Sequence, residues 1–448
     1  MAAMQPFDEG DQTKVDASPT KAFFVDIITR DIPLDKAIQD LVDNCIDGAK
    51  RLRPGPDDSY EGLWVRLEVS ENEFKISDNC GGIPLETARK HAFKFGRSKE
   101  FQSTPFSVGQ FGVGMKRALF KMGDHFKVTS VEPNSRFDVE VNVPHWSEQP
   151  SWDFHLSDLV ESENQIDATG TIIQVTSLHR GVANTFRLDA FKTNLRNQVR
   201  VVQQHFMRKG LQIFFGDEAL ISSEWQLSTG EGIEPSFRRY EDDLGGAGPL
   251  RTRLYAGIGS SSSAHAGWYV FCNGRCILEA DQSAKTGWSE ATDDGVTAPK
   301  YHGQFARFRG YAFLDCEDAS ILPWNTTKTD LDFDSDAYRR LRGRLIEAMR
   351  PVIDFLNELD GEKDFAAEDR DLSQAVSRTT SVPLERLPER AAFSYRPPVK
   401  RGPALTTISY KRAQPEVDAL KAALKANSNK DLGEKSFNYT YENLVEEE

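Results

Sequence analysis

One stretch near the N-terminus, residues 34–52 (LDKAIQDLVDNCIDGAKRL), constrains the fold of this chain more than any other. Its apolar residues recur at steps of three and four positions, which is the period of one buried helix face. Asp40, Asn44 and Asp47 lie along another strip of the same helix. Two carboxylates and an amide on one strip can hold a hydrated Mg²⁺ and activate a water. Taken alone, the pattern also fits an ordinary amphipathic helix with a solvated acidic face.

The composition narrows the class of protein. A length of 448 residues favours two or three domains. The formal net charge of −14 argues against general coating of nucleic acid, although a local basic groove stays compatible with it. The chain shows neither the apolar run of about 18 residues that a membrane helix needs nor a secretory signal, so we expect a cytoplasmic protein without membrane association. The five cysteines lack the paired spacing of a zinc site or a disulfide framework.

The order of the expected elements is typical of an α+β protein. The first helix is followed by two strands, a short helix, a long loop containing glycine and serine, another helix and a strand meander. We place these elements at residues 63–69, 74–77, 85–95, 96–114, 113–122, 125–131, 136–143 and 171–178. This order predicts an α/β sandwich rather than a βαβ alternation.

The remaining chain predicts further units. A second α/β unit follows residue 180 and is closed by a helical run at 336–359. From residue 361 the chain is rich in Pro, Arg and Ser and is expected to be a linker. The expected organisation is a mobile arm at 1–18, a domain at 19–180, a second domain at 181–360 and a linker with a C-terminal extension at 361–448.

Two motifs inside the first domain have a chemical rationale. Asp78 starts DNCGGIP (78–84) at an expected strand end, where its carboxylate can accept a hydrogen bond from an exocyclic amine such as that of adenine. Gly82 and the glycine before it let the backbone approach a flat base closely. GQFGVG (109–114) precedes a helix, and backbone N–H groups at a helix N-terminus bind phosphate.

These motifs, in this order and followed by Gly170-Thr171, resemble those of the GHKL ATPases: gyrase B, the ninety-kilodalton heat-shock chaperones, histidine kinases, MutL and MORC proteins. DLVDNCIDGA (40–49) resembles the N-box, DNCGGIP the adenine motif, and VGQFGVGMKRAL (108–119) the glycine box of the phosphate lid. The resemblance spans residues about 20–180 and implies a Bergerat-type ATP-binding domain.

The resemblance also implies roles for single residues. Asn44 would ligate Mg²⁺, Asp78 would bind the adenine amine, and Asp40 would orient or deprotonate the attacking water. The nucleotide and its phosphates would be lined by Asp47, Gly82, Lys99, Gly109, Gln110, Phe111, Gly112, Val113, Gly114, Lys116 and Thr171.

Two positions depart from the family pattern. The general base of the family is usually Glu, whereas this chain has Asp40, which is one methylene shorter, so the water must sit closer to the helix. Cys80 replaces the first glycine of the adenine motif, which puts the local turn geometry in question.

The second unit resembles the transducer domain of the MutL, gyrase and MORC branch. The similar segments are GWYVFCNGRCIL (267–278) and LPWNTTKTDLDF (322–333). Lys328 matches the lysine that reaches the γ-phosphate in that branch, although a lysine in a polar loop is by itself more often a surface residue. Lys192, Arg196 and Arg200 form a basic stripe, for which a solvated surface is favoured over a face that holds DNA.

The resemblance therefore implies a Mg²⁺-dependent ATP hydrolase that closes as a homodimeric clamp when ATP binds. Its cargo could be DNA or a partner protein, and roles in DNA maintenance or phage defence follow by analogy alone. A non-hydrolysing scaffold or chaperone-like module is the alternative. A histidine kinase is disfavoured because its acceptor histidine precedes the N-box, whereas the first histidine here is His91.

Overall fold

The computed structural model describes residues 18–54, 59–96, 104–109, 112–162, 168–290, 295, 297–366, 369–396 and 408–445. The chain forms two compact units, a large one that ends at Arg396 and a small one that follows it. Within the described ranges, no helix is both long and apolar enough to cross a bilayer. The expected mobile arm lies outside these ranges except for its last residue.

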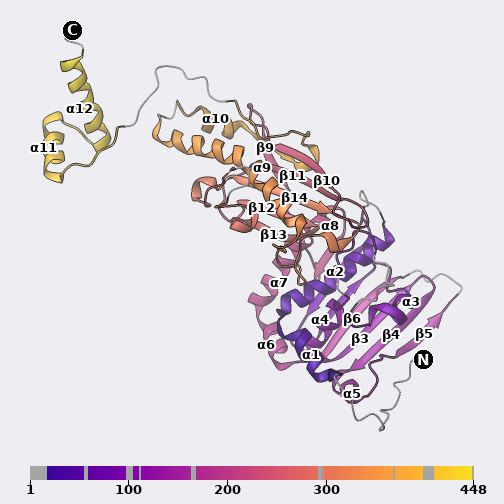
Figure 1. Ribbon diagram of the computed structural model, residues 1–448. Helices are drawn as coiled ribbons and strands as arrows, with labels where there is room; N and C mark the ends of the chain where they lie inside the picture. The colour runs from indigo at the N-terminus through magenta and orange to yellow at the C-terminus, as the bar shows by residue number, and fades with distance from the viewer. Residues whose placement is uncertain are drawn as a thin grey trace, which may run out of the picture. The chain divides into compact units, whose positions relative to one another are not determined.

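An eight-stranded mixed sheet forms the first layer of the large unit (Figure 1). Its strands are arranged in the order β5-β4-β3-β6-β2-β1-β7-β8, and β1 pairs antiparallel with β2 and parallel with β7. The strands are Trp64–Val69 (β1), Phe74–Asp78 (β2), Gly123–Glu132 (β3), Ser135–Asn142 (β4), Leu156–Glu161 (β5), Gly170–Leu178 (β6), Gln212–Phe215 (β7) and Glu218–Ala219 (β8).

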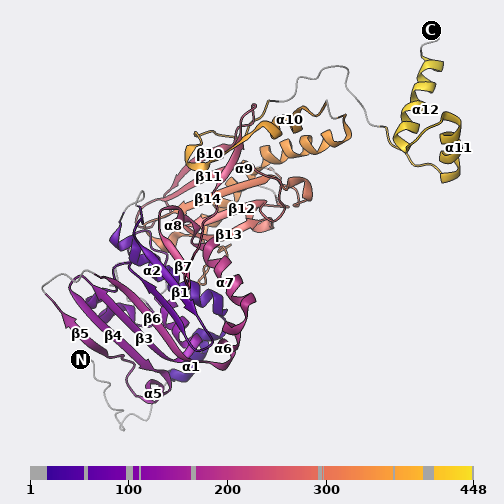
Figure 2. The ribbon, with the colours of Figure 1, turned by 180° about the vertical axis from the view of Figure 1, so that it is seen from behind.

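Helices cover one face of this sheet. Figures 1 and 2 show α1 (Lys21–Arg30), α2 (Leu34–Leu52) and α4 (Gly114–Met122) on that face, while the opposite face is turned to the viewer in Figure 2. In β1, Val65 and Leu67 are buried while the residues between and after them are more accessible, which is the alternation of a strand covered on one side. The helix predicted at 34–52 is confirmed.

Short helical elements and a helical connection complete this layer. They are Leu85–Thr87 (α3), the π-helical turn Ala88–Ala92 (η1), Val143–Glu148 (α5), Arg180–Arg187 (α6), Asp189–Val202 (α7) and Gln204–Arg208 (α8). Val182, Phe186, Val199 and Ile213 belong to the same hydrophobic core as α2. The core therefore continues past residue 180, where we expected a domain boundary, because β7 returns to pair with β1.

A five-stranded sheet forms the second layer, in the order β10-β11-β14-β12-β13. The long helix α9 (Asp336–Gly361) packs on one face, and an aromatic cluster that includes Trp225 and Phe313 packs on the other. Since both faces are covered, β12 and β14 are buried almost throughout. The strands are Gln226–Thr229 (β9, outside this sheet), Ser236–Asp242 (β10), Leu250–Ile258 (β11), Gly267–Cys272 (β12), Arg275–Asp281 (β13) and Phe308–Asp315 (β14).

The segment after residue 361 corrects one expectation. It contains the helix Asp371–Arg378 (α10) and the strand Thr380–Pro383 (β15), and β15 pairs with β9. Leu372 and Val376 of α10 are buried, so apolar residues at helical spacing outweigh the linker-like composition. The small unit is a helical hairpin of Gln414–Leu424 (α11) and Asn429–Leu444 (α12), in which Leu432 is buried. Helices combined with mixed sheets confirm the α+β class.

Candidate functional site

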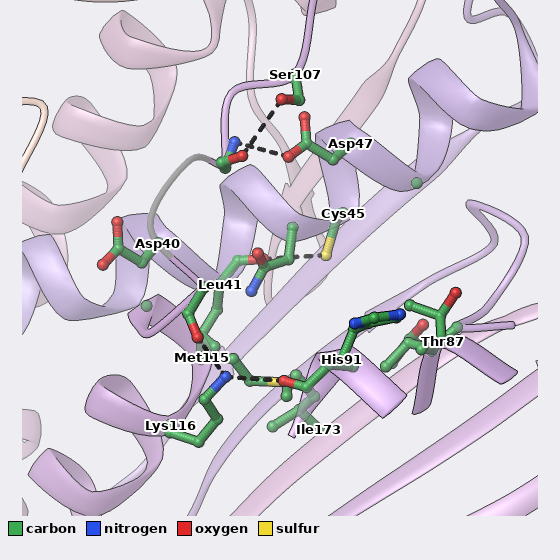
Figure 3. A pocket seen from close by; sticks show the side chains of 18 of the residues that line it. Asp40, Leu41, Cys45, Asp47, Thr87, His91, Ser107, Met115, Lys116 and Ile173 are labelled. Carbon is green, nitrogen blue, oxygen red and sulfur yellow. Dashed lines mark hydrogen bonds between the residues drawn. The ribbon is translucent and has the colours of Figure 1, made fainter. Parts of the chain in front are cut away.

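A cavity of about 280 Å³ opens between α2, the turn after β2, α4 and the loop that carries Lys328 (Figure 3). Every expected site residue within the described ranges lines it: Asp40, Asn44, Asp47, Asp78, Gly82, Gly109, Gly112, Val113, Gly114, Lys116, Thr171 and Lys328. The other three expected residues, Lys99, Gln110 and Phe111, lie outside the described residues.

Asp78 forms one end of the cavity. It is the last residue of β2 and lies opposite Thr171 in the ladder with β6. Its Oδ1 accepts hydrogen bonds from the backbone N–H groups of Cys80 (2.8 Å) and Thr171 (3.3 Å). Burial raises the pKa of the Asp78 carboxyl, and these backbone bonds work in the opposite direction. The arrangement holds a nearly buried carboxyl group at a fixed position on the wall.

The turn after Asp78 depends on two glycines. Gly81 and Gly82 have φ values of +90° and +73°, which L side chains rarely adopt. A Cβ on Gly82 would lie 2.3 Å from the carbonyl oxygen of Val131, so this position also lacks space for a side chain. Cys80 has no such requirement and is buried, which resolves the question raised by its replacement of the first glycine.

The three side chains of the polar strip of α2, Asp40, Asn44 and Asp47, line the cavity but differ in burial and in hydrogen bonding. Asp47 accepts hydrogen bonds from the N–H groups of Val108 and Gly109, each at 2.7 Å, and so fixes the start of the glycine-rich segment. Asn44 is exposed and makes no side-chain hydrogen bond to another described residue. Asp40 is buried, with 4% of its surface exposed.

Asp40 lies between two cations. Its Oδ2 accepts a hydrogen bond of 2.5 Å from Nη2 of Arg117, and its Oδ1 lies 3.6 Å from Nζ of Lys328. Gly114 packs against the carboxylate, because a Cβ at that position would lie 3.1 Å from Oδ2 of Asp40. The expected water-activating carboxylate is therefore held in place by residues from α4 and from the loop at Lys328.

Asp43 is a site residue that the sequence analysis missed. It is fully buried, and Oδ2 lies 2.8 Å from Nζ of Lys328 and 3.0 Å from Nη1 of Arg275. Its Oδ1 accepts a hydrogen bond of 3.0 Å from Nε2 of Gln203. Burial alone would raise the pKa of the Asp43 carboxyl, but the two cations outweigh it and hold the pKa below its usual value. In the sequence, Asp43 lies three residues after Asp40 and four before Asp47, so it belongs to the polar side of the helix.

Lys116 does not point freely at the cavity. It is buried, and its ammonium donates hydrogen bonds to the carbonyl oxygens of Ala92 (2.8 Å) and Gly112 (2.5 Å), as Figure 3 shows. In this state Lys116 joins the π-helical turn to the glycine loop. Its expected contact with phosphate stays a prediction.

Residues 104–109 are fastened to both layers. Nζ of Lys50 donates hydrogen bonds to the carbonyl oxygens of Phe106 (2.6 Å) and Asn273 (2.8 Å). The side-chain amide of Asn273, in the turn between β12 and β13, donates to the carbonyl oxygen of Ser107 at 3.1 Å. The segment that precedes the glycine loop is thus tied to α2 and to the second sheet.

The two arginines of the basic stripe on α7 have partners within the chain. Arg196 forms an ion pair with Glu218, and Arg200 donates a hydrogen bond to Oγ of Ser223. Arg208, just beyond α7, pairs with Glu385 at 2.8 Å. These contacts fit the favoured interpretation of a solvated surface.

Comparison with known families finds a similarity within the first layer. Residues 32–171 match the family model described as histidine kinase-, DNA gyrase B- and HSP90-like ATPase. The match begins just before α2 and ends at Thr171, so it contains every expected site residue except Lys328. No curated protein gives a significant sequence match to the chain. A closer kinship with MutL or MORC proteins stays a prediction. Residues 32–171 are thus similar to the ATPase domains of the GHKL superfamily.

Proposed function

We propose that the chain hydrolyses ATP and uses the nucleotide state to change its conformation. The observation that carries this proposal is that Asp40 and Lys328, which come from different layers, lie side by side on one wall of the cavity. Oδ1 of Asp40 is 3.6 Å from Nζ of Lys328. A candidate base next to a cation from the other layer is the arrangement expected where hydrolysis and movement are coupled.

The geometry supports one orientation of the nucleotide. Asp78 and the Gly81-Gly82 turn would take the adenine, because a carboxylate can accept the amine hydrogen and a glycine backbone permits close approach. The phosphates would lie near Gly109, Gly112 and Gly114, the last of which begins α4. Asp40 and Lys328 would then face the terminal phosphate.

The residues present fit a bound Mg²⁺. Mg²⁺ usually takes one or two protein oxygen ligands together with waters and substrate phosphates. The amide of Asn44 is exposed toward the cavity and makes no side-chain hydrogen bond within the described structure, so it would hold the ion. Among the described residues, no group of three Asp, Glu, His or Cys side chains is placed so that it could hold a metal ion by itself. The bound ion would neutralise phosphate charge.

In the proposed reaction, Asp40 accepts a proton from a water molecule while the water oxygen bonds to the γ-phosphorus. The bond between this phosphorus and the β–γ bridging oxygen breaks, so that ADP and inorganic phosphate leave. Asp40 then returns the proton to solvent. Lys328 would stabilise the charge on the γ-phosphate.

Lys328 would also transmit the nucleotide state. A γ-phosphate beside Lys328 would compete with Asp43 for its ammonium, and the loop of Lys328 packs with the second sheet through Trp324 and Leu331. We further propose that ATP closes two protomers as a clamp around a partner. DNA maintenance and phage defence are candidate settings, and the paired arginines of α7 give no support to DNA as the partner.

One observation favours a second candidate, a nucleotide-dependent scaffold that does not hydrolyse ATP. Both oxygens of Asp40 face cations, so the carboxylate has few free positions for a water. In this case ATP would bind and order the site without turnover.

Steady-state phosphate release by the wild type and by Asp40→Asn separates the two candidates. Hydrolysis predicts Mg²⁺-dependent release that Asp40→Asn lowers about 10²- to 10⁴-fold while ATP still binds. A wild type that binds ATP but releases phosphate at the background rate would instead establish the scaffold. Light scattering with a non-hydrolysable ATP analogue tests closure, and a monomer under every nucleotide condition contradicts the clamp.

A further inference from the structure

The basic side chains around the cavity differ in what holds them. Among the described residues, four arginines and lysines line it: Arg51, Lys116, Arg117 and Lys328. Arg51 donates to the carbonyl oxygen of Gly82 at 2.9 Å, at the end where Asp78 lies. Lys116 is held by two backbone carbonyls. Arg117 and Lys328 are held by carboxylates.

Arg117 is a residue to which the proposed reaction assigns no role. It lies in the first turns of α4, three residues after Gly114, and its side chain is 13% exposed. Nη2 is paired with Oδ2 of Asp40, whereas Nε is buried without a hydrogen-bond partner among the described residues. The guanidinium therefore keeps unused donor capacity beside the carboxylate that would face the terminal phosphate.

We propose that, when ATP binds, the guanidinium of Arg117 leaves Oδ2 of Asp40 and binds the terminal phosphate instead. Arg117 would then be a catalytic residue, and its movement would also free Oδ2 of Asp40. This inference rests on the proposed function, because it requires ATP in the cavity. A guanidinium binds phosphate through two parallel hydrogen bonds, which one carboxylate oxygen does not offer in the present geometry. The greater negative charge of the phosphate favours the exchange.

The exchange would give Asp40 room to bind the attacking water, although both of its oxygens face cations in the structure. With Arg117 on its Oδ2 and Lys328 near its Oδ1, the carboxylate has few free positions for the water, but after the exchange Oδ2 becomes available. ADP has no γ-phosphate, so it leaves Arg117 on Asp40. Arg117 thereby distinguishes ATP from ADP at the position where the chemistry takes place.

The test compares two nucleotides rather than activity. Calorimetric titration in Mg²⁺ measures the affinities of the β,γ-imido analogue of ATP and of ADP for the wild type and for Arg117→Gln. We expect Arg117→Gln to weaken binding of the analogue by about 10- to 100-fold, the size of a charged hydrogen bond, and to change ADP binding by less than about threefold. Arg117→Lys keeps the positive charge but lacks the two parallel N–H groups of the guanidinium. It should therefore lose less affinity for the analogue than Arg117→Gln does.

Arg51→Gln is the matched control. It removes an arginine of the same cavity at the Asp78 end, so it should weaken both nucleotides by the same factor. Retained ADP binding shows in addition that Arg117→Gln is folded. Equal weakening of both nucleotides by Arg117→Gln would overturn the inference.

A double variant distinguishes direct binding of Arg117 to the phosphate from neutralisation of the Asp40 charge by Arg117. The quantity compared is the affinity for the ATP analogue divided by the affinity for ADP. If Arg117 only neutralises Asp40, the double variant Asp40→Asn/Arg117→Gln should have the wild-type value of this ratio. That result would contradict the inference. If Arg117 contacts the phosphate, the ratio stays low in the double variant, while Asp40→Asn alone binds the analogue more tightly than the wild type does. A wild type that binds neither nucleotide would overturn the proposed function as well.

Discussion

The ammonium of Lys328 lies 2.8 Å from Oδ2 of Asp43, and this buried pair joins the second layer to the helix that forms the wall of the cavity. Asp43 also contacts Arg275 of β13, so two cations from the second layer converge on one carboxylate of α2. The nearer partner of Lys328 is Asp43, and not the expected catalytic Asp40. This relationship makes Asp43 the anchor between the layers.

Removing the charge of Asp43 should cost more stability than removing that of Lys328. Asp43→Asn leaves two buried cations without their carboxylate, for which about 3–5 kcal/mol of unfolding free energy is expected. Lys328→Met leaves Asp43 with Arg275 and Gln203, so its cost should be smaller. Urea unfolding at pH 7 measures both, and a larger loss for Lys328→Met would contradict the anchor role.

Lys50 should make stability depend on pH above neutrality. Burial lowers the pKa of Lys50 from 10.5 to about 8, although Asp47, Asp315 and Asp43 raise it, and Lys209 lowers it further. Between these two pKa values the unfolded chain binds more protons than the folded one. The free energy of unfolding should therefore rise with pH from about 8 to about 10.5, by up to about 3 kcal/mol.

Lys50→Met tests this pH dependence. The variant loses the titrating group, so the difference in unfolding free energy between wild type and variant should grow across that pH range. Lys90→Met, at an exposed position on η1, is the control for removing a lysine that is not buried. A constant difference for Lys50→Met would show that its ammonium is not penalised by burial.

Gly82 should tolerate no side chain, in contrast to Gly62. Both have positive φ, but a Cβ on Gly62 meets nothing within 4 Å, whereas one on Gly82 meets the Val131 carbonyl oxygen at 2.3 Å. Gly62→Ala should therefore cost about 1–2 kcal/mol, the strain of the left-handed backbone alone. Gly82→Ala should cost about 1–3 kcal/mol more and weaken ADP binding. Equal losses in thermal unfolding would show that the turn relaxes away from Val131.

The elements around the cavity could be predicted from local pattern, because their signals lie within one turn or one helix. Apolar spacing predicts α2, and glycines at 81 and 82 predict the turn after Asp78. Asp43 escaped because its partners Gln203, Arg275 and Lys328 are 160 to 285 residues away and come from other elements. A buried carboxylate and a solvated one look the same in the sequence until those partners are placed.

The directions of the side chains of Lys116 and Arg117 could not be predicted from the sequence either. Lys116 and Arg117 are neighbours after the glycine loop, and the sequence analysis favoured Lys116 for phosphate. In the structure Lys116 binds backbone carbonyls, and Arg117 binds Asp40. Successive helix positions point about 100° apart, so the register of α4 on α2 decides which of the two cations faces the site. That register depends on packing between helices and not on the motif.

The last prediction concerns the tie between the second sheet and residues 104–109. The side chain of Asn273 donates to the carbonyl oxygens of Ser107 and Cys316 and accepts from the N–H of Cys316 at 2.9 Å. Asn273 has φ +46°, so Asn273→Gly removes these bonds without adding backbone strain.

Hydrogen exchange in Asn273→Gly should report whether this tie holds the segment. Loss of a buried polar partner costs about 1–3 kcal/mol, so exchange of the amides at 104–109 should accelerate about tenfold or more. Amides in the middle of β3, which belongs to the first sheet, serve as the internal control and should be unchanged. Unaltered exchange at 104–109 would show that the contacts of the segment with Asp47, Lys50 and Glu317 are sufficient to hold it without the Asn273 side chain.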